Sequence, residues 1–143
     1  MLCPLLQAGV RHITIASRTV AKAGARVASH SALAALQKAE LLALSPQAVE
    51  GDFDVIINAT ASSLAGDAVP VPASVLRPGS LAYDMMYGPA AQGFLDWAQA
   101  HGAVARDGLG MLVEQAAEAF AIWRGVRPPS AQVLEELRRA APH

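Results

Sequence analysis

The sequence predicts an α/β fold in which a parallel sheet carries helices on both faces. Short apolar segments rich in β-branched residues alternate with longer amphipathic segments along the chain, and this order is typical of parallel sheets. The apolar run at 53–58 closes on a polar residue, as expected of a strand buried on both sheet faces. The length of 143 residues supports one domain with a substantial core, spanning 1–143.

The individual elements follow from apolar spacing, capping residues and breaks at glycine or proline. We expect helices at 4–9, at 20–28 with a continuation after a break at 31–36, and at 90–101, 109–124 and 131–140. We expect strands at 12–16, 41–44, 53–58, 80–84 and 103–105, and a proline-rich loop with one helical turn at 66–78. Thr19 and Ser130 are expected to cap the helices that follow them, and Gly9 and Gly125 to end the helices before them.

Composition excludes several classes of protein. The formal net charge is −1 and charged residues make up 16% of the chain, so no basic surface for nucleic acid is expected. No apolar run reaches the roughly 20 residues that a membrane-spanning helix needs. Cys3 is the only cysteine, which excludes a disulfide framework or a zinc site. We therefore expect no bound metal and a cytoplasmic location.

Polar residues that follow the expected strands are the first candidates for a binding site. Ligands of parallel α/β sheets bind at the carboxyl ends of the strands, which lie at one edge of the sheet. The candidate clusters are Ser17-Arg18-Thr19, Asn58-Ala59-Thr60, Asp84-Met85-Met86-Tyr87 and Asp107-Gly108.

Arg18 and Lys22 flank the start of the first long helix, where positive charges oppose the helix dipole. A bound anion would make this arrangement favourable. In nucleotide-binding domains an acid after the second strand holds the ribose of NAD, whereas an arginine accommodates the 2′-phosphate of NADP. No acid lies between Ile13 and Lys22. The alternative is a solvated surface arginine.

The next two clusters are suited to a flat, apolar ligand. The Asn58 amide can bridge neighbouring loops, and the small residues of 59–63 leave space over the backbone. The alternative is that Asn58 only stabilises a turn. Met85 and Met86 offer soft apolar surface beside a nicotinamide ring, unless they are ordinary core residues.

Two glycines, Gly108 and Gly110, lie at the start of the helix at 109–124. Each costs about 1 kcal/mol of helix stability against alanine, so we expect a close approach to the backbone there. At about 100° per residue, one stripe is expected to face the core; it comprises Leu109, Leu112, Val113, Ala116, Phe120 and Trp123. The opposite face comprises Met111, Gln115, Glu118 and Ile122. The apolar members of this face indicate that the helix buries a second side, where Gln115 can hydrogen-bond to whatever covers it. The alternative is a surface glutamine beside two exposed apolar residues.

The four clusters, in this order, resemble the nucleotide-binding half of shikimate dehydrogenases over residues 5–137. The family has Asn-Arg-Thr followed by a basic residue where this chain has Ser17-Arg18-Thr19 and Lys22. The resemblance implies a Rossmann-like, doubly wound parallel sheet with C-terminal helices, and NADP as cofactor. It also implies the reversible NADPH-dependent reduction of 3-dehydroshikimate to shikimate, in the biosynthesis of chorismate and aromatic amino acids.

The resemblance further implies a role for each site residue. Arg18, Thr19 and Lys22 bind the 2′-phosphate, with Ser17 at the position of the family asparagine. The cofactor path is lined by Asn58, Ala59, Thr60 and Ala61. Met85 and Gly108 lie near the nicotinamide, and Met111 also belongs to the cofactor-binding residues. Tyr87 and Gln115 reach toward shikimate.

Two parts of the family pattern are not found in the sequence. The glycine-rich loop and its strand are expected directly before Met1, and the substrate domain supplies the catalytic lysine and aspartate of the family. We therefore assign no catalytic residue and expect a partial domain that is inactive alone, with open edges on the strands at Ile13 and Val55 that favour self-association. The alternatives are a non-catalytic nucleotide-binding module that acts through a partner, or a fragment of an NAD-dependent quinate or shikimate dehydrogenase.

Overall fold

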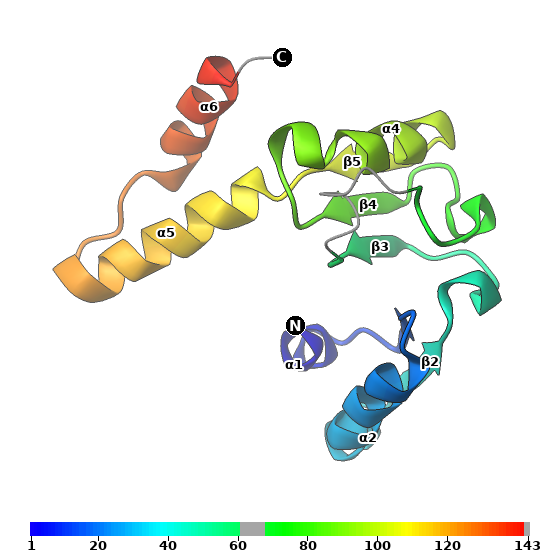
Figure 1. Cartoon of the computed structure of the whole chain (residues 1–143). Coiled ribbons are helices and arrows are strands. Elements are labelled where there is room, and N and C mark those ends of the chain that lie inside the picture. Colours follow the sequence, from blue (N-terminus) through cyan, green and yellow to red (C-terminus); the bar gives the residue numbers. More distant parts are fainter. Residues whose placement is uncertain (61–67, 142–143) are drawn as a thin grey trace. The chain divides into compact units, whose positions relative to one another are not determined.

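The computed structural model describes residues 1–60 and 68–141. The chain forms two compact units, one of residues 1–51 with 70–75 and the other of residues 52–69 with 76–143. Each unit has a parallel sheet and helices of its own (Figure 1). The predicted α/β class with parallel strands is confirmed.

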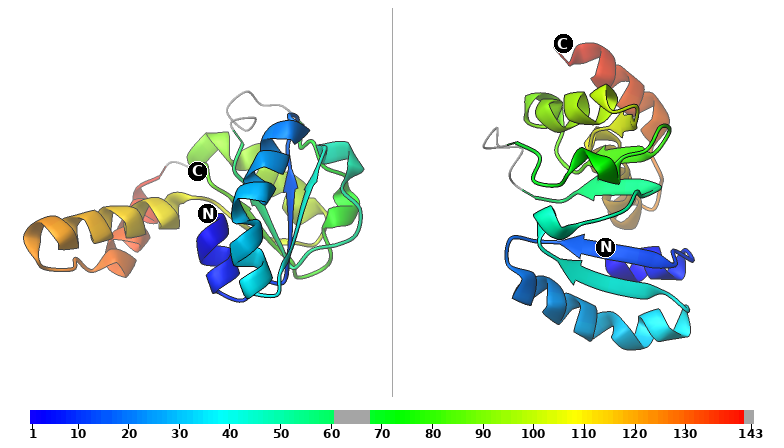
Figure 2. Two further views of the ribbon diagram at one scale, coloured as in Figure 1. Left: turned by 90° about the horizontal axis from the view of Figure 1, so that it is seen from below. Right: turned by 90° about the vertical axis from the view of Figure 1, so that its right-hand side faces the viewer.

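The first unit is a strand–helix–strand motif. Strand β1 (His12–Ala16) runs parallel to β2 (Glu40–Leu44), and α2 (Val20–Leu36) connects them. Helix α2 packs along β2, and α1 (Leu2–Gln7) packs against α2 (Figure 2). Leu6, Ala23 and Ala34 are buried here, and the two alanines allow the helix to lie close to its neighbours. Two short 3-10 helices, η1 (Pro46–Ala48) and η2 (Ala73–Val75), complete the unit.

The second unit has a three-stranded parallel sheet in the order β3-β4-β5. Its strands are β3 (Val55–Asn58), β4 (Leu81–Asp84) and β5 (Val104–Arg106). After the 3-10 helix η3 (Gly88–Ala90), helix α4 (Gln92–Ala100) packs against β4 and β5. Its buried residues, Phe94 and Ala98, form a core together with Ala82 of β4.

Helices α5 (Leu109–Arg124) and α6 (Ser130–Ala140) form a hairpin that leads away from β5 (Figure 1). Gly125 ends α5 in the left-handed conformation with φ 69°, as its position after the apolar pattern predicts. Arg127 in the connection donates hydrogen bonds to Glu118 and Glu114, over 2.6 and 2.7 Å. Helix α6 folds back along α5 after this turn, and the ion pairs link the connection to α5.

Three expectations about helices differ from the structure. Helix α2 is continuous, because the Ser29 and Ser31 hydroxyls donate to carbonyl groups one turn earlier and do not interrupt the helix. Thr19 is the N-cap residue of α2, but its hydroxyl makes no capping bond; the Ser17 hydroxyl accepts the Thr19 N–H over 3.2 Å. Helix α6 begins at Ser130, so Ser130 is its first residue and Pro129 occupies the N-cap position.

The expected core stripe of α5 is largely exposed. Val113 and Ala117 are buried, whereas Leu112, Phe120 and Trp123 are 41%, 45% and 79% exposed. Ile122 on the opposite face is exposed as well. Helix α5 packs mainly against α6, so neither of its apolar sides is covered over its full length by the part of the chain that the structure describes.

The strands at Ile13 and Val55 have open edges. Within residues 1–60 and 68–141, β1 pairs only with β2, and β3 pairs only with β4. Both strands therefore leave one row of backbone groups without a strand partner. Among these residues no helix combines the length and apolar character needed to cross a membrane.

Candidate functional site

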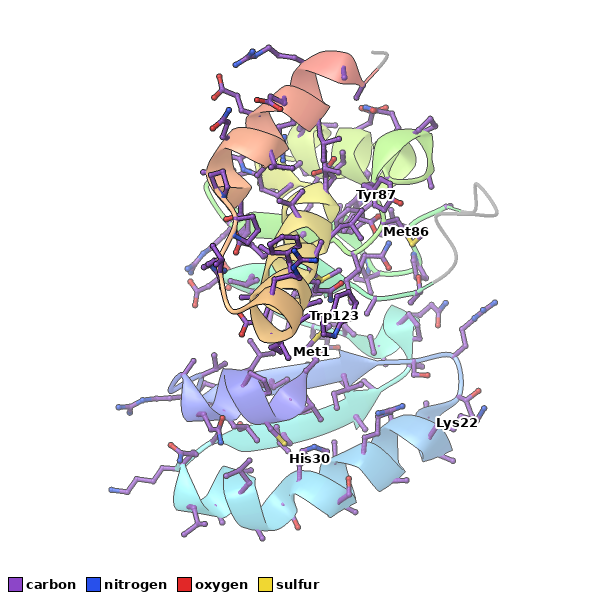
Figure 3. All side chains as sticks on the ribbon, turned by 90° about the vertical axis from the view of Figure 1, so that its left-hand side faces the viewer. Met1, Lys22, His30, Met86, Tyr87 and Trp123 are labelled. Carbon is purple, nitrogen blue, oxygen red and sulfur yellow. The ribbon has the colours of Figure 1, made fainter. Side chains whose placement is uncertain are left out.

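The first group of candidate residues lies at the junction of β1 and α2. The Ser17 N–H donates to the carbonyl of Leu44 over 3.1 Å, which extends the pairing with β2 by one residue. Ser17 also holds the turn through the N–H of Thr19, and the N–H of Lys22 donates to the Thr19 carbonyl. Arg18, Thr19 and Lys22 are exposed, and Figure 3 shows Lys22 at the start of α2.

The electrostatics of this group favour an anion. The first turn of α2 contains no acidic residue, and neither Arg18 nor Lys22 makes an ion pair with any described residue. Two cations beside the positive end of a helix dipole repel it, and a bound phosphate would change that repulsion into attraction. The sequence prediction that places Arg18 and Lys22 at a helix start is confirmed.

The second group lies at the carboxyl ends of β3 and β4. The Asn58 Nδ2 atom donates to Asp84 Oδ2 over 3.1 Å, and Asn58 Oδ1 accepts the N–H and the hydroxyl of Thr60 over 3.2 and 2.8 Å. Asp84 Oδ1 in turn accepts the N–H of Met86 over 2.8 Å. The Asn58 amide thus links the loop after β3 to the end of β4, as its position at the end of a strand suggests.

The backbone after β4 lies in close contact with Gly108, at the start of α5. The Gly108 N–H donates to the carbonyl oxygen of Met86 over 2.7 Å. A Cβ atom at this position would overlap the carbonyl oxygen of Met85 and lie 2.6 Å from its carbonyl carbon, which is closer than real contacts allow. It would also lie 3.2 Å from the carbonyl oxygen of Asp84, which is a tight contact. Residue 108 is glycine because the chain after β4 passes directly over it. Gly110 has no such restriction, since a Cβ atom placed there would have Leu134 Cδ2 as its nearest neighbour, at an ordinary contact distance of 3.7 Å.

The other expected site residues lie at varied depths in the second unit. Met85, Met86 and Met111 are half-buried, whereas Ala59, Tyr87 and Gln115 are exposed. Met86 and Tyr87 lie together just beyond β4 (Figure 3). Ala61 falls outside the described residues. No hydrogen bond within 1–60 and 68–141 joins Tyr87 or Gln115 to the network of Asn58 and Asp84.

Asp84 is the residue whose importance sequence reasoning missed. It was predicted as the acidic end of a strand and as part of a candidate cluster, but it was assigned no role. Its side chain is fully buried and bonds the Asn58 amide at the end of β3 and the Met86 N–H after β4. The available signal was a single acid at the end of an apolar strand. Among the described residues no group of three or more His, Cys, Asp or Glu side chains comes together.

The hairpin of α5 and α6 encloses an apolar groove outside both groups. Leu112, Phe120, Val133 and Leu137 are among the residues that line it, and its surface is almost entirely apolar. Trp123 lies exposed near the end of α5 (Figure 3).

Comparison with known proteins identifies the family. A model of the shikimate 5′-dehydrogenase C-terminal domain matches residues 108–138. The shikimate dehydrogenase (NADP(+)) of Verminephrobacter eiseniae is 76% identical over 141 residues, which is 99% of this chain and 49% of that protein. The chain belongs to the shikimate dehydrogenase family.

Solved structures agree with this assignment. An Ael1 enzyme from Pseudomonas putida is 44% identical, with a TM-score of 0.78 over 95% of this chain and 49% of that one. The shikimate 5-dehydrogenase of Thermus thermophilus, in complex with NADP(H) and shikimate, is 29% identical with a TM-score of 0.66, over 95% of this chain and 48% of that one. The chain spans about half the length of the curated relatives it matches.

Proposed function

We propose that the chain is the NADP-binding part of a shikimate dehydrogenase, which reduces 3-dehydroshikimate reversibly to shikimate at the expense of NADPH. The relative from Verminephrobacter eiseniae bears NADP(+) in its name, and the structure from Thermus thermophilus contains NADP(H) and shikimate. The observation that carries the proposal is the start of α2 in this family member, where Arg18 and Lys22 meet no acid in the first turn.

In this proposal the two groups of residues serve different parts of NADP. Arg18, Thr19 and Lys22 bind the 2′-phosphate, and Ser17 holds their turn. Asn58, Ala59, Thr60 and Ala61 belong to the cofactor path, with Met85, Gly108 and Met111 toward the nicotinamide. Tyr87 and Gln115 reach toward the substrate. NADPH supplies the hydride, while these residues bind and orient.

The chain itself is proposed to contribute no catalytic residue. Proton transfer to the substrate oxygen commonly contributes 10²- to 10⁴-fold to such a reaction, as an approximate range. We assign that step, and the binding of the pyrophosphate, to a second part such as the remaining half of the longer relatives. A cytoplasmic location and a place in aromatic amino acid biosynthesis belong to the same proposal.

Titration with NADP and NAD tests cofactor choice. Arg18→Ala removes a charge-assisted hydrogen bond to phosphate, which is worth about 1.5–3 kcal/mol, so the Kd for NADP should rise roughly 10- to 100-fold. The Kd for NAD should stay unchanged. Arg26→Ala is the matched control, because Arg26 is also exposed on α2 but lies beyond its first turn. Equal binding of NAD and NADP by the unaltered chain would instead support the NAD-dependent alternative.

An assay of shikimate oxidation tests the enzyme assignment. The purified chain alone should show no turnover, and a mixture with a separately made substrate half of a close relative should restore it. Activity of the chain alone would show that it contains a proton-transfer group that we have not assigned. Specific NADP binding without turnover in any mixture would favour the non-catalytic module.

A further inference from the structure

Asp84 is a buried acid for which the proposed function has no use. It is the one charged side chain among the described residues with no exposed surface. Burying a carboxylate is unfavourable unless hydrogen bonds replace the lost water. Asp84 has such bonds, from the side-chain amide of Asn58 and from the N–H of Met86.

The pattern of donors and acceptors fixes the side chain of Asn58 in one orientation. Its Oδ1 atom faces two donors of Thr60, and its Nδ2 atom faces the carboxylate of Asp84. A rotated amide would bring Nδ2 against the donors of Thr60 and Oδ1 against the carboxylate. Both ends of the Asn58 amide are therefore engaged within the protein.

The buried carboxylate connects three segments of the second unit. Through Asn58 it holds Thr60 in the loop after β3, and directly it holds Met86 in the loop after β4. The carbonyl of Met86 then accepts the N–H of Gly108 before α5. The proposed function assigns the Thr60 segment to the cofactor path, and the segments of Met86 and Gly108 to the nicotinamide side of NADP.

We propose that Asp84 and Asn58 form a positioning pair that sets the nicotinamide side of the binding site, with Asp84 acting through the protein and not on the cofactor itself. The inference rests on the proposed function, adds Asp84 to it, and gives Asn58 a second role; the pair acts through Thr60, Met86 and Gly108. It differs from a general stabilising role in one respect. Disrupting the pair should weaken the binding of the nicotinamide part of NADP and spare the 2′-phosphate part.

A reciprocal exchange of the two side chains tests the pair. Asp84→Asn replaces one of the two acceptor oxygens of the side chain with an amide group. The new amide at position 84 and the amide of Asn58 are then two donors that face each other. Asn58→Asp places two carboxylates side by side. In the double variant, the new amide at position 84 can donate to the new carboxylate at position 58. That carboxylate still accepts from Thr60, and the N–H of Met86 still meets an oxygen, so the bonds that link the three segments are restored.

Two ligands separate the two sides of the site. NADP carries both parts, whereas adenosine 2′,5′-bisphosphate carries the 2′-phosphate and lacks the nicotinamide. Asp84→Asn should raise the Kd for NADP about 10-fold, in the range expected for a buried unpaired polar group. The Kd for adenosine 2′,5′-bisphosphate should change less than about twofold, and the double variant should recover most of the NADP affinity. Arg18→Ala is the opposite control, since it should weaken both ligands.

Amide hydrogen exchange in the ligand-free chain provides a readout that does not depend on NADP. Protection of the Thr60 and Met86 amides should fall in Asp84→Asn and return in the double variant. Equal weakening of both ligands by Asp84→Asn, or a double variant that does not fold or regains no NADP affinity, overturns the inference alone. An unaltered chain that binds neither ligand overturns the proposed function, and the inference with it. If Asp84→Asn does not fold, the double variant still tests the inference: it should fold and bind NADP and adenosine 2′,5′-bisphosphate nearly as the unaltered chain does, and failure to do so overturns the inference.

Discussion

The space around Gly108 is too small for any side chain. The carbonyl groups of Asp84 and Met85 cover the position where a Cβ atom would lie, and the Gly108 N–H bonds the next carbonyl, that of Met86. These groups are backbone atoms at the end of a central strand, so they cannot move aside as a flexible side chain could. A methyl group there would have to push the start of α5 away from β4.

Gly108→Ala should therefore lower the free energy of unfolding by about 1–3 kcal/mol, the usual effect of overpacking a rigid site. Gly110→Ala is the matched control, because an added methyl group meets only Leu134 at an ordinary contact distance. Alanine favours a helix over glycine by up to about 1 kcal/mol, so Gly110→Ala should be neutral or stabilising. Urea denaturation followed by circular dichroism measures both. Similar losses in the two variants would show that helix propensity, not the contact with Met85, controls this position.

At the scale of an element, polar contacts define the hairpin of α5 and α6. Arg127 bonds Glu114 and Glu118, while Arg138 near the end of α6 bonds Asp107 before α5 over 3.2 Å. The hydrogen bond from Ser130, followed by the charge and hydrogen bond of Arg127, lowers the pKa of Glu114 below its usual value of 4.5. These contacts are exposed, so each contributes modestly.

The lowered pKa of Glu114 makes the hairpin sensitive to acid. A carboxyl group with a lowered folded pKa contributes stability above 4.5, and that contribution is lost as pH falls from 4.5 through the folded pKa. Protection of α6 amides against hydrogen exchange should decrease over this range. In Glu114→Gln it should be lower at neutral pH and change less on acidification. Glu135→Gln, which removes an exposed partner of Arg139 within α6, should retain the acid-dependent decrease. A Glu114→Gln profile that coincides with that of the unaltered chain would contradict this.

Sequence patterns predicted which residues form helices and strands better than they predicted which side chains are buried and what they bond. The strands, the helices and the left-handed end of α5 at Gly125 follow from local residue order, because apolar spacing and glycine act locally. The exposure of Trp123 did not follow, since helical spacing shows which residues share a stripe but not whether another element covers it. The hydroxyls of Ser29 and Ser31 could bond either inside or outside a helix, and the residue types do not decide which.

The candidate site was predictable to a similar extent. Arg18 and Lys22 were found because a helix start and its charges are close in sequence. The role of Asp84 was missed because its partner Asn58 lies 26 positions away, and only the pairing of β3 with β4 brings them together. The role of Gly108 was expected as a close backbone approach, but the structure was needed to show that the last residue of β4 and the residue after it are what approach it.

At the scale of the whole molecule, the sheets are small and incompletely paired. One has two strands and the other three, and β1 and β3 each have an edge with no strand partner among the residues described. Sheets of this size are marginally stable unless their edges or faces are covered. The relatives are about twice as long as this chain, and the self-association expected from the open edges remains a prediction.

Strand β3 is the edge where we expect the second unit to self-associate. It carries no charged residue, and Val55 on it is 49% exposed. The opposite edge, β5, has three residues and ends at the exposed Arg106, and a charge of this kind opposes strand pairing. Val55→Lys should therefore shift the chain toward monomer, and Val104→Lys on β5 should not, although Val104 is similarly exposed at 43%. Sedimentation equilibrium over a range of chain concentrations measures the change. A monomeric unaltered chain, or equal effects of the two lysines, would show that the β3 edge does not mediate association.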